Sequence, residues 1–408
     1  MAKRIKPISV SVLIILIISS CFFSAFAVNN ESTYEKLFDN QDSIISVSFR
    51  GDTALYPANS IEGIISAANN GADIVSANVM KTKDGVLVLC EDKSLSNILA
   101  TDKDSVSELT FSQIENLYLL DQSSVPTEYK MCTLINALDV CEMGVMLLLD
   151  FDWSLADEIY SLLNGENALS KVILRTKQDP SKIEKWLSAK PIKPIVMAVY
   201  DGNIVFNAVS HLSKMSAMGM PAVQYQSKNH FNVMYGDFVS KRYSDGNNPR
   251  ALVSTCDPDF CGQRNDSEDG WNELIKKGFS IIETNNIVSL GEYIDSIESL
   301  RVSLSALTEK AACLDASVYS QVSADNLKKA MENAKSLLND GVVSRDELQS
   351  AQSALILSMN KLALNTGEDA QRGALNITFG KVLAAVLVGA AILAAQIFVH
   401  KMQRKKEK

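Results

Sequence analysis

The regular alternation of short apolar runs with helix-like stretches, from Ser43 to about Glu298, limits the fold of this chain more than any other feature. Amphipathic stretches such as SIEGIISAANNG and TFSQIENLYLL separate the apolar runs. Nine runs have the composition of strands: IISVSF, ADIVSANV, VLVLC, VMLLLDF, VILRT, PIVMAVY, AVQYQ, ALVST and SIIET. Strands that alternate with helices predict an α/β fold with a parallel sheet, and a segment of about 270 residues suits one TIM-type (β/α)8 barrel.

The strand candidates outnumber the strands of such a barrel by one. The second and third runs are separated only by the turn KTKDG, Lys81 to Gly85. This turn is too short for the crossover that joins two parallel strands, whereas an antiparallel hairpin needs only a short connection. We therefore expect the third run to pair with the second as a hairpin-like extension.

Residues 299–364 differ in character, with leucine and alanine at helical spacing and no strand pattern. Three helices fit the segment; SADN and SRDE predict N-caps at Ser323 and Ser344, and Gly341 predicts the end of the second helix. We expect a small three-helix bundle. Its sequence DASVYSQVSADNLKKAMENAKSLLNDGVVSRDELQSAQSALILSMNKL resembles the FIVAR-type helical modules of Gram-positive surface and cell-wall proteins.

The two ends of the chain predict export and a membrane anchor. A basic start, an apolar run and the small-x-small sequence Ala25-Phe26-Ala27 are typical of a secretory signal peptide. The apolar run from Val382 to Val399 is long enough to span a bilayer, and a basic tail follows it, so we expect an extracytoplasmic type I single-pass protein. The expected organisation is a signal peptide at 1–27, a barrel at 28–298, a helical bundle at 299–364, a linker at 365–380, a transmembrane helix at 381–400 and a basic cytoplasmic tail at 401–408.

Other modes of attachment stay open at this stage. Cys21 follows Ile-Ser-Ser, as in some lipoprotein signals. Thr366-Gly367 is similar to the end of the Leu-Pro-x-Thr-Gly cell-wall sorting signal, but Ala363 and Leu364 stand at its first two positions. The sequence does not decide whether the C-terminus is retained in the membrane or sorted to the wall.

Charge and cysteine content narrow the possible partners and compartments. The chain has a formal net charge of −9, and because both ends are basic, the segment between them is more acidic still. Such a domain does not suit nucleic acid or another anionic polymer. Cysteine pairs Cys132–Cys141 and Cys256–Cys261 could close small disulfide loops outside the cytoplasm, and scattered buried thiols are the alternative.

Several segments resemble, in order and spacing, the glycerophosphodiester phosphodiesterase family. They are Phe49-Arg50-Gly51, Pro57-Ala58-Asn59-Ser60, GADIVSANVMKTKDGVLVLCEDKSL, VSELTFSQIENL, TLINALDV, VMLLLDF and GWNELIKKGFSIIETN. The resemblance covers nearly all of the first domain and implies an α/β barrel that cleaves glycerophosphodiesters with a divalent cation, calcium or magnesium. Such chemistry needs an acid, a base and groups that neutralise the phosphate charge.

The resemblance also implies that the catalytic groups are replaced. The first family histidine aligns on Phe49, which cannot transfer a proton, and the His-Asp pair aligns on Glu91 and Asp92. Arg50 persists, either as a ligand for an anion together with Asn59 or as the ion-pair partner of nearby acids. Neither His211 nor His230 matches a catalytic position of the family.

The cation ligands implied by the resemblance are replaced as well. Their positions align on Ala58, Ser76, Asn78 and Asp150, so one carboxylate remains where an intact site has several. Calcium and magnesium prefer clustered oxygen anions, so we expect no bound cofactor. Asp152 stands where the family has a lysine, and the alternative of a rebuilt cation site at this acidic mouth stays open.

These observations predict a membrane-anchored barrel at the cell surface that has kept its framework without its catalytic groups. We expect it to bind or organise an envelope component or surface protein. The alternative is an active phosphoric diester hydrolase in lipid metabolism that uses Glu91 and Asp150 in an altered mechanism. A third interpretation gives the binding role to the helical segment and makes the barrel a spacer.

Overall fold

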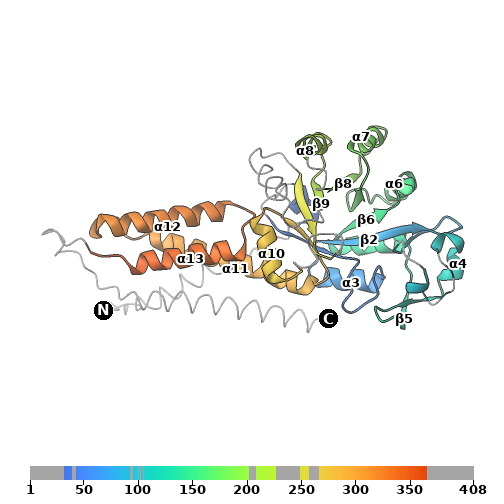
Figure 1. Ribbon diagram of the computed structural model, residues 1–408, viewed down its shortest axis with the longest axis horizontal. Coiled ribbons are helices and arrows are strands. Elements are labelled where there is room, and N and C mark those ends of the chain that lie inside the picture. Colours follow the sequence, from blue (N-terminus) through green and yellow to red (C-terminus); the bar gives the residue numbers. More distant parts are fainter. Residues whose placement is uncertain are drawn as a thin grey trace, which may run out of the picture.

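A computed structural model describes much of the chain, and Figure 1 shows its arrangement. The described residues are 32–38, 43–91, 95–99, 101, 103, 105–201, 208–226, 249–256 and 266–364, of which 201 and 208–212 are described by their backbone alone. The predicted signal peptide, linker, transmembrane helix and tail lie outside them, as do Asp92 and His230. Within the described part, no helix is both long and apolar enough to span a bilayer.

Parallel strands close into a barrel, as the alternating pattern predicts. In the described residues the closed sheet has the order β1-β2-β6-β7-β8-β9-β10-β11, and β11 pairs with β1 to complete the ring. The strand bounds are β1 Ile45–Ser48, β2 Ile74–Lys81, β6 Met146–Phe151, β7 Val172–Thr176, β8 Ile195–Asp201, β9 Ala222–Gln226, β10 Arg250–Ser254 and β11 Ile281–Thr284. The TIM-type barrel prediction is confirmed.

The predicted hairpin is also confirmed. Strand β3, Leu87–Leu89, runs antiparallel to β2 and lies outside the parallel ring. Gly85 in the connecting turn has a φ of 89°, a left-handed conformation that favours glycine. The short turn therefore sets the direction of the third apolar run.

The expected helix over TFSQIENLYLL is wrong in its second half. Helix α4 covers only Phe111–Ile114, and Tyr118–Leu120 forms strand β4, which pairs with β5, Pro126–Lys130. Leu119 is buried in a small cluster with Leu99, whereas Tyr118 is exposed. This alternation and the partner strand outweigh the local helical pattern.

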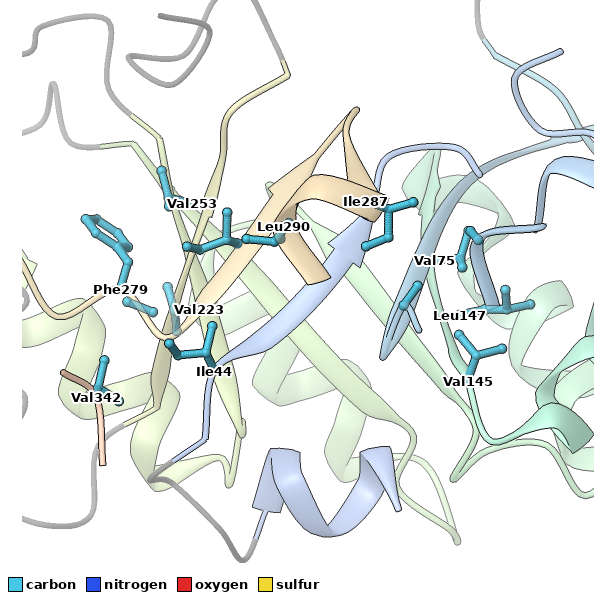
Figure 2. Close-up of a cluster of buried hydrophobic side chains, with 14 of the residues drawn as sticks. Ile44, Val75, Val145, Leu147, Val223, Val253, Phe279, Ile287, Leu290 and Val342 are labelled. Carbon is cyan, nitrogen blue, oxygen red and sulfur yellow. The ribbon is translucent and has the colours of Figure 1, made fainter. Parts of the chain in front are cut away.

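Helices surround the barrel and complete its core. Their bounds are α2 Thr33–Phe38, α3 Ile61–Asn69, α5 Leu134–Leu138, α6 Ala156–Gly165, α7 Pro180–Ser188, α8 Ala208–Ala217 and α10 Glu268–Lys276; short 3₁₀ turns are η1 Leu95–Asn97, η2 Val106–Glu108, η3 Asp139–Met143 and η4 Trp153–Leu155. Successive strand residues face opposite sides, so Leu148 packs inside the barrel and Leu147 packs outside it. Figure 2 shows part of the outer cluster, with Leu147 of β6, Val75 of β2 and Leu290 of the helix that follows β11.

Three further helices extend from one side of the barrel (Figure 1). They are α11 Ile287–Ala312, α12 Gln321–Asn339 and α13 Arg345–Asn360, with η6 at Ala316–Val318 between the first two. Helix α11 follows β11 directly and runs without interruption through the expected boundary at 298/299. Its buried Leu304 and Leu307 belong to the same hydrophobic cluster as Leu290 near the barrel.

Polar contacts also join α10 to the start of α13. The Asn272 side chain donates to Asp346 at 2.6 Å, and Lys276 pairs with the same carboxylate at 2.7 Å. Arg345 pairs with Glu268 at 2.6 Å. The barrel and the first turn of α13 are therefore held together by both apolar and polar contacts.

The two predicted helix caps have different outcomes. Ser344 caps α13 and forms a capping box with Glu347, as predicted. The cap at Ser323 is wrong, because α12 begins one turn earlier, after Ser320. The Ser323 hydroxyl instead donates to the carbonyl of Ser320 at 2.9 Å and accepts from the amide of Ala363 at 3.3 Å.

The disulfide that Cys132 and Cys141 could form, one of the two alternatives left open by the sequence, is not present. Both thiols are free and buried, as is that of Cys256, and Cys90 is buried as well. Burial raises the pKa of Cys132 to about 12 and that of Cys141 to about 11. These residues are packed thiols, which is the alternative that the sequence left open, and Cys261 lies outside the described residues.

Candidate functional site

The candidate site lies at the carboxyl ends of the barrel strands, where TIM-type barrels place their functional groups. Asn78 of β2, Asp150 of β6 and Arg175 of β7 are register partners along three neighbouring strands. Hydrogen bonds from Arg175 extend across the barrel to β9 and β11. These inward-facing polar residues cap the apolar interior formed by residues such as Leu148 and Ile173.

The rim of the mouth is formed by the turn after β1. Arg50 has a φ of 61°, and its backbone N–H donates to the Ser76 hydroxyl at 3.2 Å. Gly51 follows with a φ of 90°, and a Cβ there would lie 2.8 Å from the carbonyl carbon of Gly63 in α3. Glycine is needed at this position because the turn lies directly against the helix.

The side chain of Arg50 lies between an aromatic ring and an acid. Its guanidinium carbon is 4.3 Å from the centroid of the Phe49 ring, a cation–π contact. The same guanidinium forms an ion pair with Glu91, which follows β3. The structure therefore shows Arg50 in an ion pair with the Glu91 carboxylate, which is one of the two roles that the sequence left open.

Asn59 holds the same turn in place through two hydrogen bonds with the backbone. Its backbone N–H donates to the carbonyl of Arg50 at 2.9 Å, and its Oδ1 accepts from the backbone N–H of Asn78 at 2.9 Å. Asn59 is buried and has a φ of 62°. These contacts give it a framework role, and its neighbour Ala58 has no side-chain donor or acceptor for a ligand.

The barrel interior below the rim contains a buried ion-pair network around Arg175. The guanidinium donates to both carboxylate oxygens of Asp150, through Nε at 2.7 Å and through Nη2. Its Nη1 donates to Oε1 and Oε2 of Glu283 at 3.0 and 3.1 Å, and to Oε1 of Gln224 at 3.0 Å. Arg175 is 6% exposed and Glu283 1% exposed, so the pair is shielded from solvent.

The network determines the charge states of its members. Burial raises the pKa of Glu283, but the charge of Arg175 and hydrogen bonds from Arg175, Ser254 and Ser76 bring that pKa below its ordinary value. Burial lowers the pKa of Arg175, but Asp150 and Glu283 raise it above its ordinary value. Both groups are therefore charged near neutral pH.

The residues present do not fit the divalent cation that the resemblance implies. The two inward carboxylates, Asp150 and Glu283, are both bound to Arg175, and Ser76 and Asn78 offer only neutral oxygens. A guanidinium placed between them would repel a metal ion. In the described part of the chain, no group of three or more histidine, cysteine or acidic side chains has the arrangement of a metal site.

A cleft of about 500 Å³ opens beside this network, between β2 and the segment after β6. Its lining residues are Asn78, Val79, Met80, Lys81, Cys90, Ser107, Asp150, Phe151, Asp152, Ser154 and Leu155. Asp152 is committed to local structure, because its carboxylate accepts from the backbone N–H of Ser154 at 2.8 Å and hydrogen bonds from Ser154 lower its pKa. The cleft is large enough for a small ligand.

Asp266 has a structural role at the far side of the mouth. Its Oδ1 accepts from the Thr255 hydroxyl at 2.8 Å and from the Trp271 indole at 3.2 Å. Its Oδ2 accepts from the backbone N–H of Asn285 at 3.2 Å. This carboxylate joins the ends of β10 and β11.

Sequence reasoning missed Arg175, Glu283 and Gln224. A usable signal was present, because VILRT and SIIET each place one charged residue in an otherwise apolar strand. Charged residues are rarely buried unless they are paired, so each charge in such a strand predicts a partner inside the barrel. The sequence does not state which strand supplies that partner.

Comparisons with known proteins bear on the barrel. Residues 50–190 match the sequence model of the glycerophosphoryl diester phosphodiesterase family. A glycerophosphoryl diester phosphodiesterase structure from Parabacteroides distasonis is 19% identical, with a TM-score of 0.53, over 65% of this chain and 91% of that one. The enzyme of this name from Agrobacterium tumefaciens is 13% identical, with a TM-score of 0.47, over 60% and 99% of the two chains. No curated protein sequence matches the chain.

Proposed function

We propose that this chain, whose barrel belongs to the glycerophosphoryl diester phosphodiesterase family, is a non-catalytic member of that family that acts as a binding or scaffold module at the cell envelope. The observation that carries the proposal is the rim cluster of Phe49, Arg50 and Glu91. Phosphodiester hydrolysis needs a base for the attacking water and an acid for the leaving oxygen. Phe49 can supply neither, and its ring packs against Arg50.

Charge neutralisation supports the same conclusion. A phosphodiester anion needs positive charge at the mouth. In the described part of the mouth, Arg50 is bound to Glu91, and Arg175 is bound to Asp150 and Glu283. Counted together, these five groups carry one more negative than positive charge. They therefore disfavour the anionic group that an active family member binds.

The anchoring that we propose rests on the sequence. The signal-like N-terminus, the apolar run Val382–Val399 and the basic tail support a type I protein displayed outside the membrane. The segment after the barrel resembles FIVAR-type modules, which supports a role at the envelope surface. The proposed partner is an envelope component or a surface protein.

An active hydrolase with an altered mechanism is the second candidate function. The cleft of about 500 Å³ beside Asp150 favours it, because it leaves room for a small ligand next to a carboxylate that is 32% exposed. In that case Glu91 would be the proton-transferring group, and the Arg50–Glu91 ion pair would have to open during each turnover.

Hydrolysis of glycerophosphocholine and glycerophosphoethanolamine by the purified full-length chain in detergent separates the two candidates. The assay is run with calcium, magnesium, manganese or a chelator, beside Arg50→Ala and Glu91→Gln. We expect no turnover above either variant under any condition. Turnover that is lost in Glu91→Gln would establish the hydrolase and contradict the proposed function.

A further inference from the structure

We infer that the guanidinium of Arg175 is a built-in replacement for the family's divalent cation, and that its removal would leave a latent calcium-binding site inside the barrel. The inference deepens the proposed function, since it names the residue that excludes the metal. It is tested by the response of stability to cations, so it can fail or succeed independently of the hydrolysis assay.

The first step of the argument is the set of atoms around the guanidinium. Five side-chain oxygens from three strands accept hydrogen bonds from it: two of Asp150, two of Glu283 and one of Gln224. An all-oxygen set with two carboxylates and an amide carbonyl is the donor type that calcium prefers. The guanidinium therefore has the surroundings that a hard cation would need.

The second step is position. Asp150 aligns with a cation ligand of the family, and the register places it directly between Asn78 and Arg175. Asn78 aligns with another of those ligands, so the arginine extends the same row by one strand. From that position its side chain reaches Glu283 on β11, across the interior of the barrel.

The third step is charge. A buried carboxylate such as that of Glu283 cannot stay ionised beside a second carboxylate, that of Asp150, without a neighbouring cation. Arg175 supplies one positive charge, and Gln224 contributes a further oxygen on the side facing β9. A divalent ion would balance the same pair of carboxylates, but it cannot enter while the guanidinium holds all five oxygens.

The fourth step is a contrast with the other buried arginine. Arg250 is fully buried, and the acceptors around its guanidinium include the carbonyl oxygens of Lys36, Ser43 and Ser280 and the Ser280 hydroxyl. Those acceptors are neutral. A variant at Arg250 is therefore a matched control for losing a buried arginine without releasing the Asp150–Glu283 pair.

Thermal unfolding of the full-length chain in detergent tests the inference, with Arg175→Met, Arg175→Gln and Arg250→Met compared in chelator and in millimolar calcium, magnesium or manganese. We expect the wild-type midpoint and that of Arg250→Met to be unchanged by any cation. The midpoint of both Arg175 variants should rise by at least about 4 °C in calcium. The rise should disappear when Glu283→Gln is added to Arg175→Gln.

Two results obtained with folded proteins would overturn the inference. One is a calcium-dependent shift in the wild-type chain that is absent in Glu283→Gln, because a cation would then bind with Arg175 in place. The other is a folded Arg175→Gln protein that does not respond to calcium. The Arg175 variants could refold in calcium but not in chelator. In that case the higher folded yield in calcium supports the inference in place of the midpoint. If neither variant folds in either medium, the latent site does not exist.

Discussion

The two ends of this barrel each contain a buried arginine, and the hydrogen-bond acceptors described around the two guanidiniums differ. At the mouth, Arg175 is held by the carboxylates of Asp150 and Glu283. At the floor, Arg250 donates to backbone carbonyls, including those of Lys36 and Ser43. The mouth arginine neutralises charge, whereas the floor arginine satisfies the backbone of the segment that closes the barrel.

This difference shows that the floor and the mouth of the barrel need a buried arginine for different reasons. Leu37 of helix α2 packs into the apolar interior at the floor, and Arg250 holds the carbonyls on either side of it. Buried carbonyls need partners in any barrel that is closed in this way. The network at the mouth has a different role, since the carboxylates of Asp150 and Glu283 inside the barrel need a counter-charge.

The largest expected effect comes from Arg175→Met, which leaves Asp150 and Glu283 without a counter-charge. Removing one partner of a buried ion pair costs about 3–5 kcal/mol of unfolding free energy. The pH dependence should also invert. In the wild type the pKa of Glu283 lies below its ordinary value, so its contribution to stability is present at neutral pH and is lost as the pH falls through that lowered value.

In Arg175→Met, burial still raises the pKa of Glu283, and only the hydrogen bonds from Ser254 and Ser76 oppose it. We therefore expect the variant to gain stability as the pH falls toward 4 and to lose it as the pH rises. Urea unfolding between pH 4 and pH 8 measures both slopes, and Arg175→Met with Glu283→Gln is the control that removes the titrating group. A variant whose stability falls toward low pH as steeply as that of the wild type would contradict the proposed role of Arg175.

A smaller effect is expected from Arg250→Met at the floor. The loss leaves buried carbonyls without their donor, and each such group costs about 1–3 kcal/mol. Because these carbonyls flank α2, amide hydrogen exchange should become faster in Thr33–Phe38 than in β6. Uniform acceleration of exchange across the barrel would show that Arg250 does not act on α2 in particular.

The smallest effect is expected from Lys36→Met, also at the floor. Lys36 pairs with Asp73 at 2.6 Å, but the lysine side chain is 29% exposed. Asp73 keeps its hydrogen bonds from the backbone N–H and hydroxyl of Ser46, at 2.9 and 3.1 Å. A loss of about 0.5 kcal/mol is therefore expected in urea unfolding. A loss as large as that of Arg250→Met would mean that the floor depends on this ion pair instead of on Arg250.

The sequence was sufficient to predict the barrel because its signals are local. Nine apolar runs, each bounded by turn or helix signals, predict the strands, and the short turn at Gly85 predicts the direction of β3. The prediction failed for Tyr118–Leu120 because a tertiary partner, β5, determines its conformation. Local periodicity cannot report such a partner.

The candidate site was predictable only in part, for the same reason. The positions of Phe49, Arg50 and Glu91 followed from the family resemblance, and an ion pair between Arg50 and a nearby acid was one of the two expectations. Arg175 and Glu283 are 108 residues apart in the chain and meet only because the barrel closes. A pairing of this range depends on strand order and shear, which no single segment of the sequence specifies.

Helix α11 gives the molecule a mechanical property. At 1.5 Å per residue, its 26 residues form a rod about 39 Å long that begins at the end of β11 and continues past the barrel. Val342, near the start of α13, lies in the same apolar cluster as Phe279 at the barrel (Figure 2), so the rod is braced at its base. In the described chain this junction therefore has no hinge. A force or torque applied to α12 and α13 is transmitted directly to β11, the strand that contains Glu283.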